Sequence, residues 1–269
     1  GWVFIINAGT FLGTIVALIA IRVADLRAQP RAPRARGQIM AGFRYVLKKP
    51  AIVVILIMIG VVGTFGMNFS IFISTMATIT FHKGATEFGL LTSVMAIGSI
   101  TGALFSARQA RPRMRTIFFS SALFGLASGL SALMPTFIMF AVSLTLIGFA
   151  ALMFMTTANS MVQTTVKPAM RGRVMALYMA IFVGGTPIGA PFAGWVVNQF
   201  GPRWGLGVAA LSGVVAASVC LYWLLRYKRV RVRYTWARPR FHIGYAADGR
   251  AHELATQEIA IIEAEAQKS

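Results

Sequence analysis

The ionisable side chains of this chain leave little scope for acid–base or metal chemistry. The seven acidic residues and three histidines lie outside the long apolar stretches or at their ends, and no lysine lies within one. No Ser/His/Asp arrangement and no HExxH motif occurs. The single cysteine, Cys220, can form neither an intrachain disulfide nor a cysteine-based metal site. We therefore expect neither enzyme activity nor a bound metal or cofactor.

The chemistry left to the apolar stretches is neutral hydrogen bonding. An amide in hydrocarbon is costly unless it faces protein or water, so such residues mark either helix contacts or a solute path. Asn159 and Gln163 are four residues apart and therefore share one face of a helix. Hydrogen bonding between helices and contact with a substrate both remain open for these side chains. The candidates for a substrate path are Thr64, Asn68, Ser93, Asn159 and Gln163.

One apolar stretch, residues 184–194, combines four glycines with two prolines four residues apart. Each proline removes a backbone donor and disfavours a straight helix. In a bilayer the freed carbonyls need partners from protein or cavity water, and many transporters place sites and gates at such interruptions. We predict a helix that bends here during function, and the alternative is a static kink that only packs. The residues of this candidate gate are Gly184, Gly185, Pro187, Gly189, Pro191 and Gly194.

The elements that position these residues are membrane-spanning helices. Of the 269 residues 57% are hydrophobic and 12% charged, and the mean hydropathy is +0.71. A soluble domain carries roughly 25% charged residues, and a spanning helix needs about 20 apolar residues. We predict an all-α membrane protein with seven transmembrane helices. The predicted spans are residues 1–21, 51–74, 88–107, 116–133, 137–160, 174–197 and 205–225.

Pairs of small residues four positions apart occur in several of these spans. Gly98 and Gly102 form one pair, and Gly125 and Gly129 form another. Helices in lipid associate where small residues let their backbones approach closely. The pairs predict a tightly packed bundle without indicating any one activity.

The basic residues alternate from one side of the predicted spans to the other. Of the 26 Lys and Arg residues, all except Lys83 and Arg203 lie in the 22–49 loop, the 107–115 loop, the 167–173 loop or the tail after residue 225. An excess of Lys and Arg marks cytoplasmic loops, so we expect the N-terminus outside the cell membrane and the C-terminus in the cytoplasm. This distribution, despite a net charge of +19, argues against nucleic acid as a partner.

The loop before the second span contains a candidate surface helix. Apolar residues recur at helical spacing between Ile39 and Leu47, with Arg44, Lys48 and Lys49 among them. Such a segment favours an amphipathic helix on the membrane surface, and the alternative is an ordinary long loop. In the tail we expect a short surface helix over residues 252–265, to which the sequence assigns no role.

Three stretches together carry a resemblance to a known family. They are GFRYVLKKP at 42–50, RGRVMALY at 171–178 and GTPIGAPFAGWVVNQFG at 185–201. The chain resembles the second half of a major facilitator superfamily transporter, in the branch of the enterobactin exporter and related secretion effectors. A group of mostly basic residues, here called the basic set, resembles the cytoplasmic motif of that family but lacks the motif's acidic residue. The set consists of Gly102, Arg108, Arg111, Arg113, Arg115, Arg171 and Arg173.

The resemblance implies a domain organisation. Residues 1–21 correspond to helix six, residues 22–50 to the cytoplasmic interdomain loop with its amphipathic helix, and residues 51–226 to the carboxyl-terminal six-helix bundle; residues 227–269 are a cytoplasmic tail. The implied fold is two bundles that rock around a midplane site. The implied partners are the lipid bilayer, a small-molecule substrate and the missing N-terminal bundle of the same polypeptide.

The resemblance also implies a function, export by alternating access. Substrates in this branch are siderophores, drugs or other hydrophobic metabolites, and proton coupling uses carboxylates of the first half. Two alternatives stay open from the sequence. The first is a seven-helix receptor or sensor, which the helix number and the sidedness also fit. The second is an inactive, truncated transporter.

Overall fold

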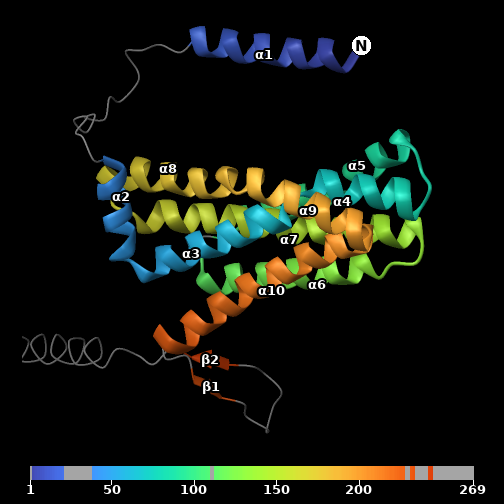
Figure 1. Ribbon diagram of the computed structural model, residues 1–269. Coiled ribbons are helices and arrows are strands. Elements are labelled where there is room, and N and C mark those ends of the chain that lie inside the picture. The colour runs from blue at the N-terminus through green and yellow to red at the C-terminus, as the bar shows by residue number, and fades with distance from the viewer. Residues whose placement is uncertain (1, 21–37, 110–111, 228–230, 234–241, 245–269) are drawn as a thin grey trace, which may run out of the picture. The chain divides into compact units, whose positions relative to one another are not determined.

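The computed structural model describes residues 2–20, 38–109, 112–227, 231–233 and 242–244, in two compact units, Gly1–Arg36 and Gly37–Ser269 (Figure 1). The first unit contains the apolar helix α1 (Trp2–Ala20), at the place of the first predicted span. The predicted surface helix at 252–265 and Arg111 of the basic set lie outside the described residues.

In the residues that the structure describes, the second unit is a helical bundle with a short strand pair. Its helices before residue 110 are α2 (Gln38–Leu47), α3 (Pro50–Val61), the π-helix η2 (Val62–Gly66), α4 (Phe69–Thr75), the π-helix η3 (Met76–Thr80) and α5 (Ala85–Ala107). The helices that follow are α6 (Met114–Ala132), α7 (Phe137–Thr165), α8 (Pro168–Gly184), α9 (Thr186–Phe200) and α10 (Pro202–Tyr227). Strands β1 (Arg231–Arg233) and β2 (His242–Gly244) pair antiparallel in the tail.

Five segments of the described residues are long and apolar enough to cross a membrane. They are Pro50–Thr80, Ala85–Ala107, Phe137–Thr165, Pro168–Phe200 and Pro202–Arg226. The apolar part of α1, Ile5–Ala20, is shorter, and α6 falls short in hydropathy because it carries one arginine and several buried serines. The structure therefore supports a multi-pass, all-α membrane fold, and the finer prediction of seven crossings stays a prediction.

Local sequence signals set the helix ends. Pro50, Pro168 and Pro202 stand at the first position of α3, α8 and α10, where a missing N–H costs nothing. The Thr136 hydroxyl accepts a hydrogen bond from the Met139 N–H at 3.3 Å and caps α7. Gly201 ends α9 with a φ of +96°, in the left-handed region that favours glycine.

The most extensive helix contact in the described bundle joins α5 to α7, which lie side by side (Figure 1). A Cβ atom added at Gly98 would overlap the carbonyl oxygen of Thr145, and one at Gly102 would overlap that of Phe149. From the other helix, a Cβ at Gly148 would overlap the carbonyl oxygen of Met95. The two backbones therefore touch, as the predicted Gly98/Gly102 pair requires.

A second glycine contact joins α6 to α10. A Cβ atom at Gly213 would lie 2.6 Å from the Cα of Gly125, and one at Gly125 would lie 2.9 Å from the backbone nitrogen of Val214. At Gly129 an added Cβ would make only ordinary contact, 3.6 Å from Ala210. Since α6 also packs against α7, the bundle continues from α5 through α7 and α6 to α10.

We expect Gly98→Leu to destabilise the bundle by about 3 kcal/mol or more, because the new side chain must separate α5 from α7. Gly89→Leu on the same helix is the matched control, since nothing lies within 4 Å of a Cβ there. The measurement is thermal unfolding in detergent, followed by size-exclusion chromatography. Equal unfolding temperatures for the two variants would contradict the backbone contact.

Candidate functional site

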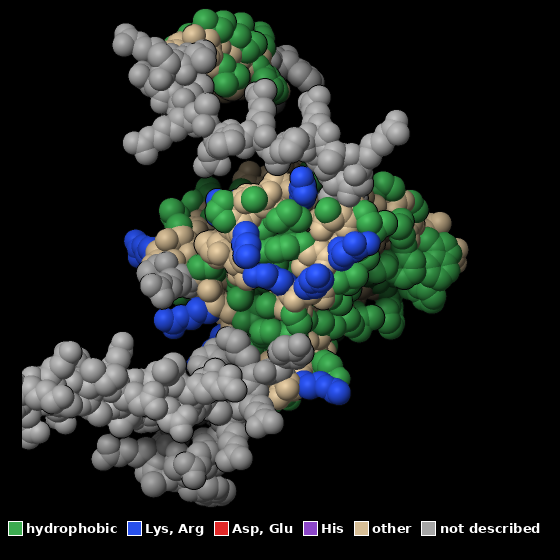
Figure 2. All heavy atoms as spheres, turned by 90° about the vertical axis from the view of Figure 1, so that its left-hand side faces the viewer, with side chains coloured by type: hydrophobic (Ala, Val, Ile, Leu, Met, Phe, Trp, Pro, Cys, Tyr) green, Lys and Arg blue, Asp and Glu red, His purple; other side chains and the backbone are tan. Residues whose placement is uncertain are grey.

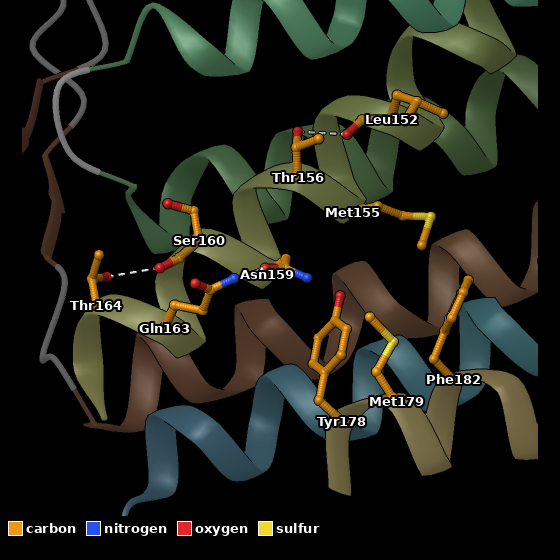
Figure 3. Close-up of a pocket in the computed structure, with 10 residues that line it drawn as sticks. All are labelled: Leu152, Met155, Thr156, Asn159, Ser160, Gln163, Thr164, Tyr178, Met179 and Phe182. Carbon is orange, nitrogen blue, oxygen red and sulfur yellow. Dashed lines mark hydrogen bonds between the residues drawn. The ribbon is translucent and has the colours of Figure 1, made fainter. Parts of the chain in front are cut away.

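A cavity of about 470 Å³ lies between α7 and α8 (Figure 3). Its volume falls within the range of small-molecule sites, which is roughly 300–1,000 Å³. The residues from α7 are Leu152, Met155, Thr156, Asn159, Ser160, Gln163 and Thr164, and those from α8 are Tyr178, Met179 and Phe182. None of these lining residues carries a formal charge, so the cavity offers only neutral hydrogen-bonding groups and apolar surface.

The polar wall of the cavity is one face of α7. Thr156, Asn159, Ser160, Gln163 and Thr164 follow the helical spacing that places side chains above one another. The Thr156 hydroxyl donates to the Leu152 carbonyl at 2.6 Å, and the Thr164 hydroxyl donates to the Ser160 carbonyl at 2.9 Å. Both hydroxyls thus donate their hydrogen bond within α7, and their oxygen atoms can still accept hydrogen bonds from the cavity.

The two amides predicted from the sequence lie together on this wall. The Gln163 Nε2 donates a hydrogen bond to the Asn159 Oδ1. This pairing uses one donor and one acceptor, so the Asn159 amide group and the Gln163 carbonyl oxygen stay available to a ligand. The sequence prediction that Asn159 and Gln163 share a face is confirmed, and their contact with substrate stays a prediction.

The opposite wall, from α8, is mostly apolar, with one polar atom. Tyr178 is 1% exposed, and its hydroxyl points toward the α7 face that carries Asn159 (Figure 3). That hydroxyl has no hydrogen-bond partner among the described residues. A buried tyrosine hydroxyl normally finds a partner. Because this oxygen is itself buried, a molecule in the cavity could reach it only after the two walls separate. The sequence analysis did not single out Tyr178. Its hydroxyl group, in a stretch of otherwise apolar side chains, could have identified it as a candidate.

The other predicted path residues lie elsewhere. Ser93 is on α5, and its hydroxyl donates to the Gly89 carbonyl of the same helix at 2.9 Å. Thr64 and Asn68 lie at an interruption of the Pro50–Thr80 segment, where η2 ends before α4. None of the three lines the cavity between α7 and α8.

The interruption at Thr64 is stabilised by Asn68. The side-chain amide of Asn68 donates to the Thr64 carbonyl at 2.8 Å, where a regular helix would supply the Asn68 backbone N–H. Asn68 is also the residue before α4, and its own carbonyl accepts from the N–H groups of Ile71 and Phe72. One side chain thereby satisfies a carbonyl that the change from η2 to α4 would leave open in lipid.

The interruption between α8 and α9 lies directly against Thr64. A Cβ atom at Gly185 would overlap the Thr64 hydroxyl, and one at Gly189 would overlap the Thr64 carbonyl. Nothing lies within 4 Å of a Cβ at Gly184 or Gly194. The glycines of the predicted gate thus divide into two that the contact requires and two that leave open space. Pro187 and Pro191 lie in α9, at its start and in its interior.

The described members of the basic set gather at one end of the bundle (Figure 2). Arg108 follows α5, Arg113 precedes α6, and Arg171 and Arg173 lie near the start of α8. Arg115 is in the first turn of α6. Gly102 differs from these residues, because it packs against the Phe149 backbone of α7.

The structure thus combines a multi-pass helical membrane fold with an open, uncharged hollow of small-molecule size between α7 and α8. Residues 61–250 match the family model of the Major Facilitator Superfamily. The chain belongs to this family, as the resemblance predicted, and membership does not favour the receptor alternative.

The chain is similar to curated members of the family named enterobactin exporter EntS. It is 28% identical to that of Citrobacter koseri, 29% to that of Shigella boydii and 28% to that of Escherichia coli, in each case over 227 residues. These alignments cover 83% of the chain. The chain spans about half the length of these relatives, 53% in each.

Gly189→Ala is expected to destabilise the protein by about 1–3 kcal/mol, because a Cβ there overlaps the Thr64 carbonyl. Gly194→Ala, later in the same helix, is the control, and it meets no atom within 4 Å. Thermal unfolding in detergent measures both. If the two alanine variants unfold together, α9 does not pack on the η2 interruption.

Tyr178→Phe is expected to leave the ligand-free protein as stable as the wild type or more stable, by about 1 kcal/mol, because it removes a buried hydroxyl that lacks a partner. The control is Tyr222→Phe, whose exposed hydroxyl accepts a hydrogen bond from Arg226 at 2.8 Å and offers no such gain. Chemical or thermal denaturation is the measurement. A loss of stability specific to Tyr178→Phe would mean that this hydroxyl is already hydrogen-bonded.

Proposed function

We propose that the chain is the carboxyl-terminal half of a small-molecule exporter that works by alternating access in the inner membrane. The observation that carries this proposal is the uncharged cavity between α7 and α8, with its unpaired polar groups, in a member of the Major Facilitator Superfamily. The names of the similar exporters support the direction of transport.

The proposed topology has seven crossings. Helix α1, within residues 1–21, is the last helix of the first half, and residues 22–50 join the halves. Residues 51–226 form the second bundle, and residues 227–269 are the tail. The 19 residues of α6 are about 28 Å long, close to the hydrocarbon thickness, which supports its inclusion among the crossings. The basic end faces the cytoplasm in this proposal, and the N-terminus of α1 faces outside.

Substrate recognition in this proposal uses both walls of the cavity. The Asn159 amide, the Gln163 carbonyl and the Tyr178 hydroxyl hydrogen-bond the polar groups of the substrate. The side chains of Met179 and Phe182 contact its apolar part. This division suits an amphipathic siderophore, drug or metabolite, and the N-terminal bundle of the same polypeptide supplies the facing half of the path.

The coupling ion in this proposal is a proton that titrates outside this cavity. The lining residues include no carboxylate, histidine or lysine, so none of them can exchange a proton with water near neutral pH. A proton-driven cycle therefore requires a carboxylate elsewhere, which we assign to the N-terminal bundle. The moving element on this side is the α8–α9 segment, which bends at the Gly184–Gly194 stretch against Thr64. The arginines of the basic set stabilise one state at the cytoplasmic face.

The test replaces Asn159 and Gln163 together with leucine in the full-length polypeptide. We expect export to fall about tenfold or more at equal protein level, because two hydrogen-bonding amides are lost from the cavity. The readout is efflux from energised cells of a panel of siderophores and hydrophobic dyes.

The matched control is Asn198→Leu with Gln199→Leu, the same residue types exposed at the end of α9 and absent from the cavity lining. Export that is intact in the Asn159/Gln163 variant, for every compound that the wild type exports, would overturn the assignment of this cavity to the substrate.

A further inference from the structure

The short helix α2 presents two different apolar faces. Gly42 and Val46 are buried, and a Cβ atom at Gly42 would lie 3.3 Å from the Cβ of Arg173 on α8. On the other face Met40, Phe43 and Leu47 are 62%, 47% and 57% exposed. Their spacing of three and four residues makes one stripe along the helix. The stripe has no cover among the described residues.

The surroundings of the stripe are basic. Arg44 and Lys48 are exposed beside it, and Lys167, Arg171 and Arg173 lie at the same end of the bundle, where Lys and Arg side chains gather (Figure 2). The acidic residue of the described bundle, Glu87, is in the first turn of α5, at the opposite end. An apolar stripe bordered by cations has the chemistry of a helix that lies in the headgroup layer of an anionic bilayer.

Helix α2 is also tied to the connection between the two cavity helices. The Tyr45 hydroxyl accepts a hydrogen bond from the Lys167 N–H at 3.2 Å, and this bond lowers the pKa of Tyr45. The Lys49 ammonium donates to the Thr165 carbonyl at 3.4 Å and lies 5.6 Å from the centre of the Tyr45 ring. We call these contacts of Tyr45 and Lys49 the α2 latch.

The α2 latch contacts the connection between α7 and α8, the two helices that line the cavity. Thr165 is the last residue of α7, whose final turns carry Gln163 and Thr164 of the polar wall. Lys167 precedes α8, which carries Tyr178 of the opposite wall. A force on α2 therefore reaches both walls through one short connection.

Resting on the proposed function, we propose that α2 binds anionic phospholipid headgroups and that the α2 latch transmits this binding to the α7–α8 connection. Anionic lipid then holds α2 on the membrane surface and fixes the spacing of the two cavity walls. In a neutral bilayer α2 is held less firmly, and the connection opens more often. Bilayer charge thereby regulates the cavity without contacting it.

The first experiment places the full-length protein in nanodiscs of phosphatidylcholine alone and of phosphatidylcholine with increasing phosphatidylglycerol. Backbone hydrogen exchange is measured over residues 38–49 and 163–172. We expect phosphatidylglycerol to slow exchange in both segments of the wild type. Arg44→Gln with Lys48→Gln is expected to raise the phosphatidylglycerol fraction needed for half-maximal protection by about twofold or more.

The matched control is Lys83→Gln with Arg203→Gln, which removes two exposed charges at the opposite end and is expected to change neither segment. Equal protection of residues 38–49 in neutral and anionic nanodiscs would overturn the proposal, because the binding of α2 would then not depend on lipid charge. Equal shifts in the two double variants would also overturn it, since charge at the α2 end would then have no special effect.

A second variant tests the α2 latch itself. Tyr45→Phe keeps the ring and the Lys49 contacts and removes the acceptor for the Lys167 N–H, so we expect lipid-dependent protection to remain at residues 38–47 and to weaken at 163–172. Unchanged protection of both segments would overturn the transmission step. Loss of protection at 38–47 would overturn it too, because Tyr45 would then be needed for lipid binding. These readouts need no substrate, so a failure of the export test leaves the lipid response standing.

Discussion

The backbone contact between α5 and α7 is the constraint on which the rest of the bundle depends. Apolar side chains gain little from meeting each other in lipid, so helices there are held by close packing and by the few polar contacts that packing allows. Gly98, Gly102 and Gly148 bring the two backbones into contact. One face of α7 is thereby fixed. The contact continues to the cavity end, where the hydroxyls of Ser106 and Thr157 are hydrogen-bonded at 3.0 Å.

The need to satisfy backbone polar groups explains how the bundle tolerates the interruption at Thr64. A bilayer offers no water to an open carbonyl, so a helix that changes its hydrogen-bonding pattern must find a substitute donor within the protein. At Thr64 the substitute is the Asn68 amide, and Gly185 and Gly189 let the second interrupted segment cover the same place. The two interruptions therefore lie against each other through Thr64, Gly185 and Gly189.

Much of the fold could be predicted because its signals are local in the sequence. Long apolar stretches predict spans, proline and glycine mark helix ends, and glycines four apart predict a tightly packed bundle, although not that α5 meets α7. The shared face of Asn159 and Gln163 follows from helical spacing alone. The contact of Thr64 with Gly185 and Gly189 could not be predicted, because it joins segments more than a hundred residues apart. The place of Tyr178 depends likewise on the register of α8 against α7, which spacing within one helix does not determine.

The division of α7 into a glycine-packed face and a polar face has a consequence for how such a protein can change over evolution. Substitutions that enlarge residues on the packed face separate two backbones, whereas substitutions at Asn159, Ser160 or Gln163 alter only what the cavity offers to a solute. If the cavity binds the substrate as proposed, binding preference and structural integrity reside in different residues of the same helix. A lineage could therefore acquire new cargo by a few point changes on one face of α7 while inheriting the bundle intact.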